Sequence, residues 1–206
     1  MWVEPYPEFS PERPLFICIL ANTETAKIPN ISAAGKSPEL TDYTPAADAE
    51  LVETGKAISI TEPPMCPSGA PTPAVLTRAS KLLTDIPCLF INAGLNVRPK
   101  IHHIDINGNP GGDIRKGHAV PDVVDIYKRS AALGRTIAKL SDLVIIGESV
   151  PGGTTTAMGV MRAMGYDGRV SSSFPNNPVE IKNKVINEGM KKSGITFGSL
   201  KDDPLR

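Results

Sequence analysis

The stretch from Leu143 to Ala157, LVIIGESVPGGTTTA, constrains the fold of this chain more than any other. Its first four residues are apolar and mostly β-branched, as in a buried strand, and a Gly-rich loop follows them. Apolar residues then recur at the spacing of one helix face, at Ala157, Val160, Met161 and Met164. A strand, a Gly-rich turn and a helix N-terminus together predict an anion site, because unpaired N–H groups and the helix dipole point toward negative charge.

The loop differs from a P-loop at one position. Gly147, Gly152 and Thr154 match the P-loop spacing, but Gly153 stands where that pattern needs lysine. This argues against hydrolysis of a nucleoside triphosphate, whereas a single phosphate monoester needs only N–H groups and hydroxyls. We therefore expect Gly152, Gly153, Thr154 and Thr155 to bind phosphate. The alternative is a tight turn whose glycines serve packing and whose Thr154 is only an N-cap.

The composition limits the partners that the chain can have. Its 22 basic and 22 acidic residues cancel, which argues against electrostatic capture of nucleic acid or of an anionic membrane. Aromatic residues make up only 5%, too few for the stacking surfaces of single-strand binders. The 206 residues suffice for a core that needs no disulfide or metal. We expect a Pro-rich lead over residues 1–14 and a single α/β domain over residues 15–206.

The cysteines and the N-terminal residues indicate an intracellular protein. Cys18, Cys66 and Cys88 are far apart and form no C-x-x-C pair, as is usual for reduced cysteines. Residues 1–14 lack the apolar core of a signal peptide. The longest apolar run, Leu15 to Ala21, is too short to cross a bilayer. We therefore expect a cytoplasmic protein.

The motifs predict neither a metal nor a cofactor. His102 and His103 are adjacent on a predicted strand, where neighbouring side chains point to opposite faces, and no third ligand stands at a suitable spacing. No G-x-G-x-x-G follows a strand, which argues against a dinucleotide. The sequence also lacks a G-x-S-x-G nucleophile elbow.

Short apolar runs alternate with helical patterns along the chain. The runs predict strands at residues 15–20, 57–60, 88–91, 101–106 and 143–146. Helices are expected after residues 121 and 154, and wherever a cap residue precedes proline, at Thr44-Pro45, Thr72-Pro73 and Asn177-Pro178. This alternation indicates an α/β fold, Rossmann-like and three-layered, with a largely parallel sheet.

Ligands of such folds bind at the carboxyl ends of the strands. The loops that leave those ends cover residues 22–25, 92–94 and 147–153, and they are also the most distinctive stretches of the chain. We therefore expect the phosphate loop to share its edge of the sheet with further substrate-binding residues, namely Asn22, Glu24, Asn92 and Gly94.

Several longer motifs occur along the chain: NTET (22–25), ISAAG (31–35), TPAADAE (44–50), PTPAV (71–75), GESVPGGTTTA (147–157) and SSS (171–173) followed by Asn177-Pro178. Together they resemble a single family, the archaeal-type branch of the nicotinate-nucleotide:dimethylbenzimidazole phosphoribosyltransferases. The similarity runs from about Leu15 to Lys192.

The resemblance implies an enzyme of cobamide lower-ligand assembly that uses no cofactor. Its phosphoribosyl donor would be nicotinate mononucleotide and its acceptor a benzimidazole-type base, giving α-ribazole phosphate and nicotinate. The leaving group is already a cationic pyridinium, so the reaction needs no acid. It does need a group that takes the N–H proton of the incoming heterocycle.

The resemblance also assigns two side chains. The glutamate that corresponds to Glu148 lies in the active site of the family, which makes Glu148 the candidate catalytic residue. Its alternative role is a loop carboxylate that accepts hydrogen bonds from neighbouring N–H groups. Lys182 resembles the family lysine that pairs with the substrate phosphate, with Lys184 as the competing choice and an ordinary exposed helix lysine as the alternative.

The chain departs from the family in length, because the family sequences continue well beyond the position of Arg206. In bacterial relatives the proposed catalytic glutamate comes from that further part, so we expect the α/β domain to be incomplete relative to the family. The chain is then a homodimer subunit, as is typical of the family, or a half completed by a partner chain. Rival functions are a non-catalytic mononucleotide-binding half and a transferase that accepts a different base.

Overall fold

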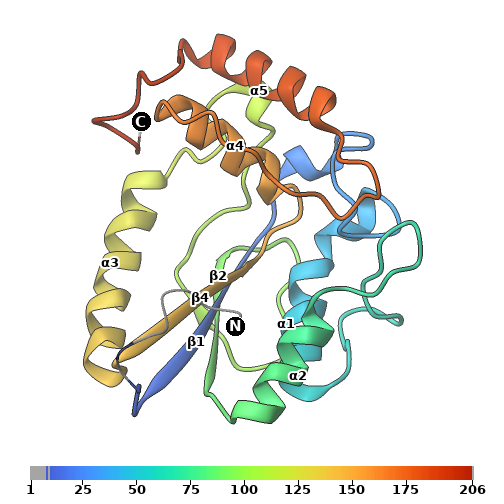
Figure 1. Ribbon diagram of the computed structural model, residues 1–206, viewed down its shortest axis with the longest axis vertical. Helices are drawn as coiled ribbons and strands as arrows, with labels where there is room; N and C mark the ends of the chain where they lie inside the picture. The colour runs from blue at the N-terminus through green and yellow to red at the C-terminus, as the bar shows by residue number, and fades with distance from the viewer. Residues whose placement is uncertain (1–7, 9, 206) are drawn as a thin grey trace.

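The computed structural model describes Glu8 and residues 10–205, so most of the predicted lead, residues 1–7 and 9, lies outside the described residues. A parallel four-stranded sheet forms the centre of the molecule, in the order β3-β2-β1-β4 (Figure 1). Its strands are β1 (Pro14–Ala21), β2 (Cys88–Gly94), β3 (Ile104–Asp105) and β4 (Leu143–Ser149). The predicted α/β fold with a parallel sheet is therefore confirmed.

Helices cover both faces of this sheet, with α1 and α2 on one side and α3 on the other (Figure 1). The chain order is α1 (Thr44–Thr54), α2 (Ala74–Thr84), α3 (Val123–Leu140), α4 (Gly153–Ala163) and α5 (Val179–Ser193). Three short 3₁₀ helices lie in the loops: η1 (Glu24–Lys27), η2 (Glu39–Asp42) and η3 (Ile114–Lys116).

The alternation of side chains along β1 explains why helices pack on both faces of the sheet. Leu15 and Ile17 point to one face, where they pack in a cluster with Ile137 of α3. Leu20 points to the other face and packs with residues of α1, α2 and β2, namely Ala49, Leu51, Val52, Ala74 and Phe90. Because successive residues of a strand face opposite sides, a run of consecutive apolar residues is what a doubly covered parallel strand requires.

Two of the predicted strands differ from the structure. The strand expected at residues 57–60 is wrong: these residues form bends, because the backbone N–H groups of Ile58 and Ser59 donate to the Glu50 carboxylate instead of to a neighbouring strand. The strand expected at residues 101–106 shortens to Ile104–Asp105.

The predicted helices are all present, but the three cap assignments before proline are wrong, and in α2 the N-cap is Pro73 instead of Thr72. Tyr43, not Thr44, is the N-cap of α1, and the Thr44 hydroxyl donates to the Ala34 carbonyl oxygen at 2.5 Å. Pro178 is the N-cap of α5, because the Asn177 side chain donates to the Val170 carbonyl oxygen at 2.7 Å.

The outer edge of β4 has no partner strand among the residues that the structure covers. Its side chains are also unusually open for a parallel strand, with Ile145 42% and Ile146 72% exposed. Parallel strands are normally covered on both faces. An apolar strand edge of this kind is a surface on which another strand can add.

Glu50 connects α1 to two loops through hydrogen bonds, and its contribution to stability can be tested. Its fully buried carboxylate accepts hydrogen bonds from Ile58 N–H (2.6 Å), Ser59 N–H (2.7 Å), Ser59 Oγ (2.5 Å) and Lys100 N–H (2.8 Å). Burial raises the pKa of Glu50, but these bonds, that of Lys100 first, hold it below its usual value. Glu50→Gln should lower the free energy of unfolding by about 1–3 kcal/mol. The NH2 group of the new amide would face N–H or O–H donors, from which it cannot accept hydrogen bonds.

Urea unfolding near neutral pH and near pH 3 checks this prediction. A depressed carboxyl pKa contributes stability above the unfolded pKa, about 4.3, and loses it as the pH falls through the folded pKa, so the deficit of Glu50→Gln should shrink in acid. Glu53→Gln, on the same helix and in an exposed ion pair with Lys81, is the control and should cost less than about 1 kcal/mol. Equal effects of the two variants would contradict the assignment.

Candidate functional site

A cavity of about 530 Å³ lies at the carboxyl end of β4 and against the middle of β1, where Phe16 and Cys18 line it. The loop from β4 to α4, residues 147–154, forms one wall. Residues 31–34, α1, the loop before α2 with the first residues of α2, the serines 171–173, and side chains of β1 and β2 form the rest. The predicted edge of the sheet therefore carries a pocket, and of the predicted site residues Glu148, Gly152, Gly153 and Thr154 line it.

The Gly-rich loop enters α4 through a left-handed residue. Gly152 is the N-cap, with φ of 77°, and a Cβ at this position would lie 3.1 Å from the Cα and N atoms of Ala26. Gly153 N–H donates to the Val150 carbonyl oxygen at 2.8 Å. The loop is thus a tight turn packed on η1, and glycine is required at position 152 by both its dihedral angle and its neighbour.

Lys182 reaches this loop from α5. Its side chain is 0% exposed, and Nζ donates to Thr154 Oγ1 at 3.2 Å and to the Ser171 carbonyl oxygen at 2.8 Å. Among Glu8 and residues 10–205, no carboxylate forms a salt bridge with it. Burial lowers the pKa of Lys182. Lys184 is exposed, so the geometry favours Lys182 as the lysine of this site.

Thr155 is placed differently from its neighbours in the loop. It is fully buried and does not line the cavity. Its Oγ1 is enclosed and finds no hydrogen-bond partner within the described part of the chain. Buried hydroxyls normally have partners. Thr155 therefore lies behind the loop, and Thr154 presents the hydroxyl that faces Lys182.

Two carboxylates border the cavity. Burial raises the pKa of Glu148, and a hydrogen bond from the Val150 N–H partly offsets this effect. Burial raises the pKa of Asp48 to about 6, against hydrogen bonds from Ser149 and Thr72 and with a further rise from the charge of Glu148. Ser149 Oγ donates to Asp48 Oδ2 at 2.7 Å, and Thr72 Oγ1 donates to Oδ1 at 2.8 Å.

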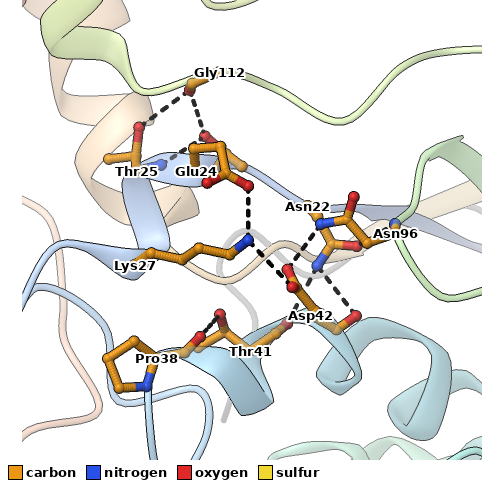
Figure 2. Close-up of polar contacts among 10 residues, drawn as sticks. Asn22, Glu24, Thr25, Lys27, Pro38, Thr41, Asp42, Asn96 and Gly112 are labelled. Atoms are coloured by element: carbon orange, nitrogen blue, oxygen red, sulfur yellow. Dashed lines mark hydrogen bonds and ion pairs between the residues drawn. The ribbon is translucent and has the colours of Figure 1, made fainter.

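Asn22 and Glu24 lie outside this cavity, in a network that ties the loop after β1 to η2 (Figure 2). Asn22 Nδ2 donates to the Thr41 carbonyl oxygen at 3.2 Å, and its Oδ1 accepts from Asn96 N–H at 2.9 Å. Glu24 pairs with Lys27 at 2.8 Å, whose ammonium also lies 3.2 Å from Asp42. The polar atoms of these side chains are therefore engaged in holding loops together.

Asn92 and Gly94 also lie away from the cavity. Asn92 Oδ1 accepts from the N–H groups of Gly94 and Leu95, both at 3.0 Å, and its Nδ2 donates to Asp105 at 3.1 Å. A Cβ on Gly94 would lie 2.3 Å from the Asn109 carbonyl oxygen. The turn after β2 is thus closed by its own side chains and by a close backbone approach.

Sequence reasoning missed the polar residues that α1 and the loop before α2 contribute. Thr44, Asp48 and Val52 all line the cavity, and their spacing of four residues places them on one face of α1. That spacing, with a single carboxylate between alanines in TPAADAE, is the signal that was available in the sequence. Thr72 and Ser149, which hold Asp48, have no comparable signal because they are far from it along the chain.

The described residues hold no cluster of three or more His, Cys, Asp or Glu side chains arranged for a metal ion. Within the same residues, no helix combines the length and apolarity needed to cross a membrane. The histidine pair at residues 102 and 103 precedes β3, and His103 Nδ1 contacts the Ile101 carbonyl oxygen at 2.9 Å.

The chain is similar to several archaeal proteins described as UPF0284. A UPF0284 protein of Methanosarcina mazei is 55% identical over all 206 residues, which cover 59% of that protein. One of Methanosarcina acetivorans is 54% identical over the same length and share. One of Methanothermobacter thermautotrophicus is 46% identical over 197 residues, 93% of this chain and 55% of that protein. The chain thus spans less than two thirds of the length of these relatives, and no protein-family model matches it.

Two solved structures share its fold. The crystal structure of CobT from Thermus thermophilus has a TM-score of 0.58 and 16% identity, over 87% of this chain and 50% of that one. The nicotinate-nucleotide-dimethylbenzimidazole phosphoribosyltransferase from the same organism has a TM-score of 0.56 and 16% identity, over 87% and 49%. At this identity the likeness shows a common fold, which covers half of each solved chain.

Replacing Gly152 with alanine should affect stability differently from replacing a glycine inside a helix. Gly152→Ala should lower stability by about 1–2 kcal/mol for the left-handed backbone alone, with a further cost from the contact with Ala26. Gly134→Ala is the control: Gly134 lies within α3 with nothing within 4 Å of a new Cβ, so the change should raise stability by about 0.5–1 kcal/mol. Thermal unfolding measures both, and changes of the same sign would contradict this account.

Proposed function

We propose that this chain binds a mononucleotide through its phosphate at the β4–α4 loop and acts in phosphoribosyl transfer from nicotinate mononucleotide to a benzimidazole-type base. The observation that carries the proposal is the enclosed ammonium of Lys182, whose partners within residues 10–205 are two neutral oxygens. A buried charge without a counter-ion is costly, and an anion in the adjoining cavity offsets that cost.

The site suits a monoester better than a triphosphate. The loop lacks a lysine at position 153, but α5 supplies Lys182 to the side of Thr154. Thr154 and the serines 171–173 line the cavity and provide hydroxyls for a single phosphate, and the Lys182 ammonium contacts Thr154 and Ser171 directly behind them. The cavity of about 530 Å³ also falls within the usual range of small-molecule sites.

Glu148 is the proposed catalytic side chain at the sugar end of this site. Its Oε2 lies 3.4 Å from the position of a Cβ on Gly153, so it adjoins the phosphate loop. A ribose whose phosphate occupies the loop would bring C1′ toward this carboxylate. Positive charge develops at C1′ as the bond to the pyridinium nitrogen lengthens, and a fixed negative group stabilises it.

A second candidate function is a mononucleotide-binding half that needs further polypeptide for catalysis. Its support is the unpaired outer edge of β4 among the described residues together with the exposed Ile146, and the share of the UPF0284 relatives that the chain covers. The phosphate loop, α4 and α5 are all present in this chain. Phosphate binding is then a property of the chain under both candidates, and turnover distinguishes them.

Turnover tests the first candidate directly. The chain is mixed with nicotinate mononucleotide and dimethylbenzimidazole, and release of nicotinate and formation of α-ribazole phosphate are followed by chromatography. Glu148→Gln keeps the size of the side chain and removes its charge, so kcat should fall about 100-fold or more while mononucleotide affinity changes little. Mononucleotide binding without turnover in the wild-type chain would favour the second candidate, and absence of both would refute the proposed site.

Lys182 and Lys184 provide a matched pair for the phosphate assignment. Lys182→Met removes a charge-assisted contact, so nicotinate mononucleotide affinity should fall about 10- to 100-fold by calorimetry. The same change should leave the melting temperature unchanged or raise it, because it removes a buried charge. Lys184→Met, at an exposed position of the same helix, should alter neither quantity. A large loss of affinity from Lys184→Met alone would reverse the assignment.

A further inference from the structure

The lining of the cavity includes a group of apolar side chains. Ala49, Val52, Ala74 and Phe90 belong to one core cluster, against which Cys18 packs, and all of them also line the cavity. Such side chains provide no hydrogen bonds, but they suit a flat aromatic ring. The proposed phosphate site does not use them.

Asp48 adjoins both these apolar side chains and the phosphate loop. It precedes Ala49 on α1, and its two oxygens are held from opposite directions. Thr72 Oγ1, just before α2, donates to one oxygen at 2.8 Å, and Ser149 Oγ, at the end of β4, donates to the other at 2.7 Å. Each carboxylate oxygen can accept more than one hydrogen bond, so the group keeps acceptor capacity toward the cavity.

We propose that Asp48 receives the ring N–H of the incoming aromatic heterocycle and takes its proton as the heterocycle attacks. The inference rests on the proposed function and adds a residue to it. A flat, largely apolar ring with one N–H donor fits a group of apolar side chains next to the Asp48 carboxylate, which follows Ala47 and precedes Ala49 on α1. The hydroxyls of Thr72 and Ser149 fix the orientation of that carboxylate before the ligand arrives.

The step balances without any further reactant. The lone pair of one ring nitrogen forms the new bond to C1′, and the C1′–pyridinium bond breaks with its electron pair returning to the nicotinate nitrogen. The N–H proton on the second ring nitrogen passes to Asp48, which leaves the product heterocycle neutral. Because the two ring nitrogens point in different directions, one can face C1′ while the other faces Asp48.

The groups around Asp48 support this division of roles. Glu148 adjoins Gly153 of the phosphate loop, near which the sugar is expected, whereas the Asp48 carboxylate is held by Ser149 and Thr72. Cys18 of β1 is the other titratable neighbour, and burial, then the charges of Asp48 and Glu148, raise its pKa to about 12. The thiol is therefore neutral and cannot accept the proton. A proton acceptor works best when its pKa is near the working pH, and burial places that of Asp48 at about 6.

A ligand pair tests the proposal by equilibrium binding. Benzimidazole carries a ring N–H, and 1-methylbenzimidazole replaces that hydrogen with a methyl group. The wild-type chain should bind benzimidazole about 10-fold or more tightly than the methylated ligand, as expected for a hydrogen bond to a charged acceptor. In Asp48→Asn the preference should largely vanish, whereas a purely steric effect of the methyl group would persist.

Two controls keep the test decisive. Asp42→Asn removes a carboxylate on η2, outside the cavity, and should leave the ligand preference as in the wild type. If Asp48→Asn does not fold, the wild-type preference is measured against pH and should decline as the pH falls through about 6, where Asp48 becomes protonated. The ratio of the two affinities largely cancels protonation of the ligands themselves.

Failure of this inference is distinguishable from failure of the proposed function. Equal affinity for the two ligands, no binding of either, or a preference that Asp48→Asn leaves intact would overturn the role of Asp48. These results are obtained without nicotinate mononucleotide, whose binding is tested separately through Lys182. A preference that depends on Asp48 supports the inference whether or not the mononucleotide is bound.

Discussion

The enclosed ammonium of Lys182 is the interaction on which the site depends. It links α5 to the start of α4 and to Ser171 through hydrogen bonds to two neutral oxygens. The lysine is held in place by the helix that carries it, because Val185, one turn further on, packs with Ile28 and Ile31 after β1. Apolar packing thus sets the position of the ammonium, and its hydrogen-bond partners among the described residues are the neutral oxygens of Thr154 and Ser171. This arrangement is the basis of the proposed anion site, because its donors are held in position before a ligand binds.

The three loops at the carboxyl edge of the sheet have different tasks, although parallel strands bring all of them to one side. Asn22 and Asn92 use their side-chain oxygens to accept backbone N–H groups, which closes the turns after β1 and β2. The loop after β4 instead lines a cavity, together with Thr154 and its hydroxyl at the start of α4. The distinctive composition of a loop therefore does not by itself separate a binding loop from a well-capped turn.

Periodicity predicted most of the fold, because each strand and helix here is stabilised by a local pattern that agrees with its surroundings. It failed at residues 57–60, where a β-like run is captured by Glu50 from a different element. The proposed phosphate loop could be predicted from its sequence pattern of a strand, glycines and the start of a helix. Lys182 was not visible in that way, since it lies 28 residues from Thr154 and only the resemblance to a family singled it out. Asp48 was missed because its partner Ser149 is 101 residues away.

The two carboxylates of the cavity would respond differently to additional polypeptide at the open edge. Glu148 lies on β4, whose outer side is unpaired among the described residues, so a strand added there would bury it further. Its pKa, already raised by burial, would rise again. Asp48 lies on α1, on the inner side of the cavity, and its oxygens are already held by Thr72 and Ser149. The acceptor proposed for the heterocycle is thus built into this chain, whereas the charge state of Glu148 depends on what covers β4.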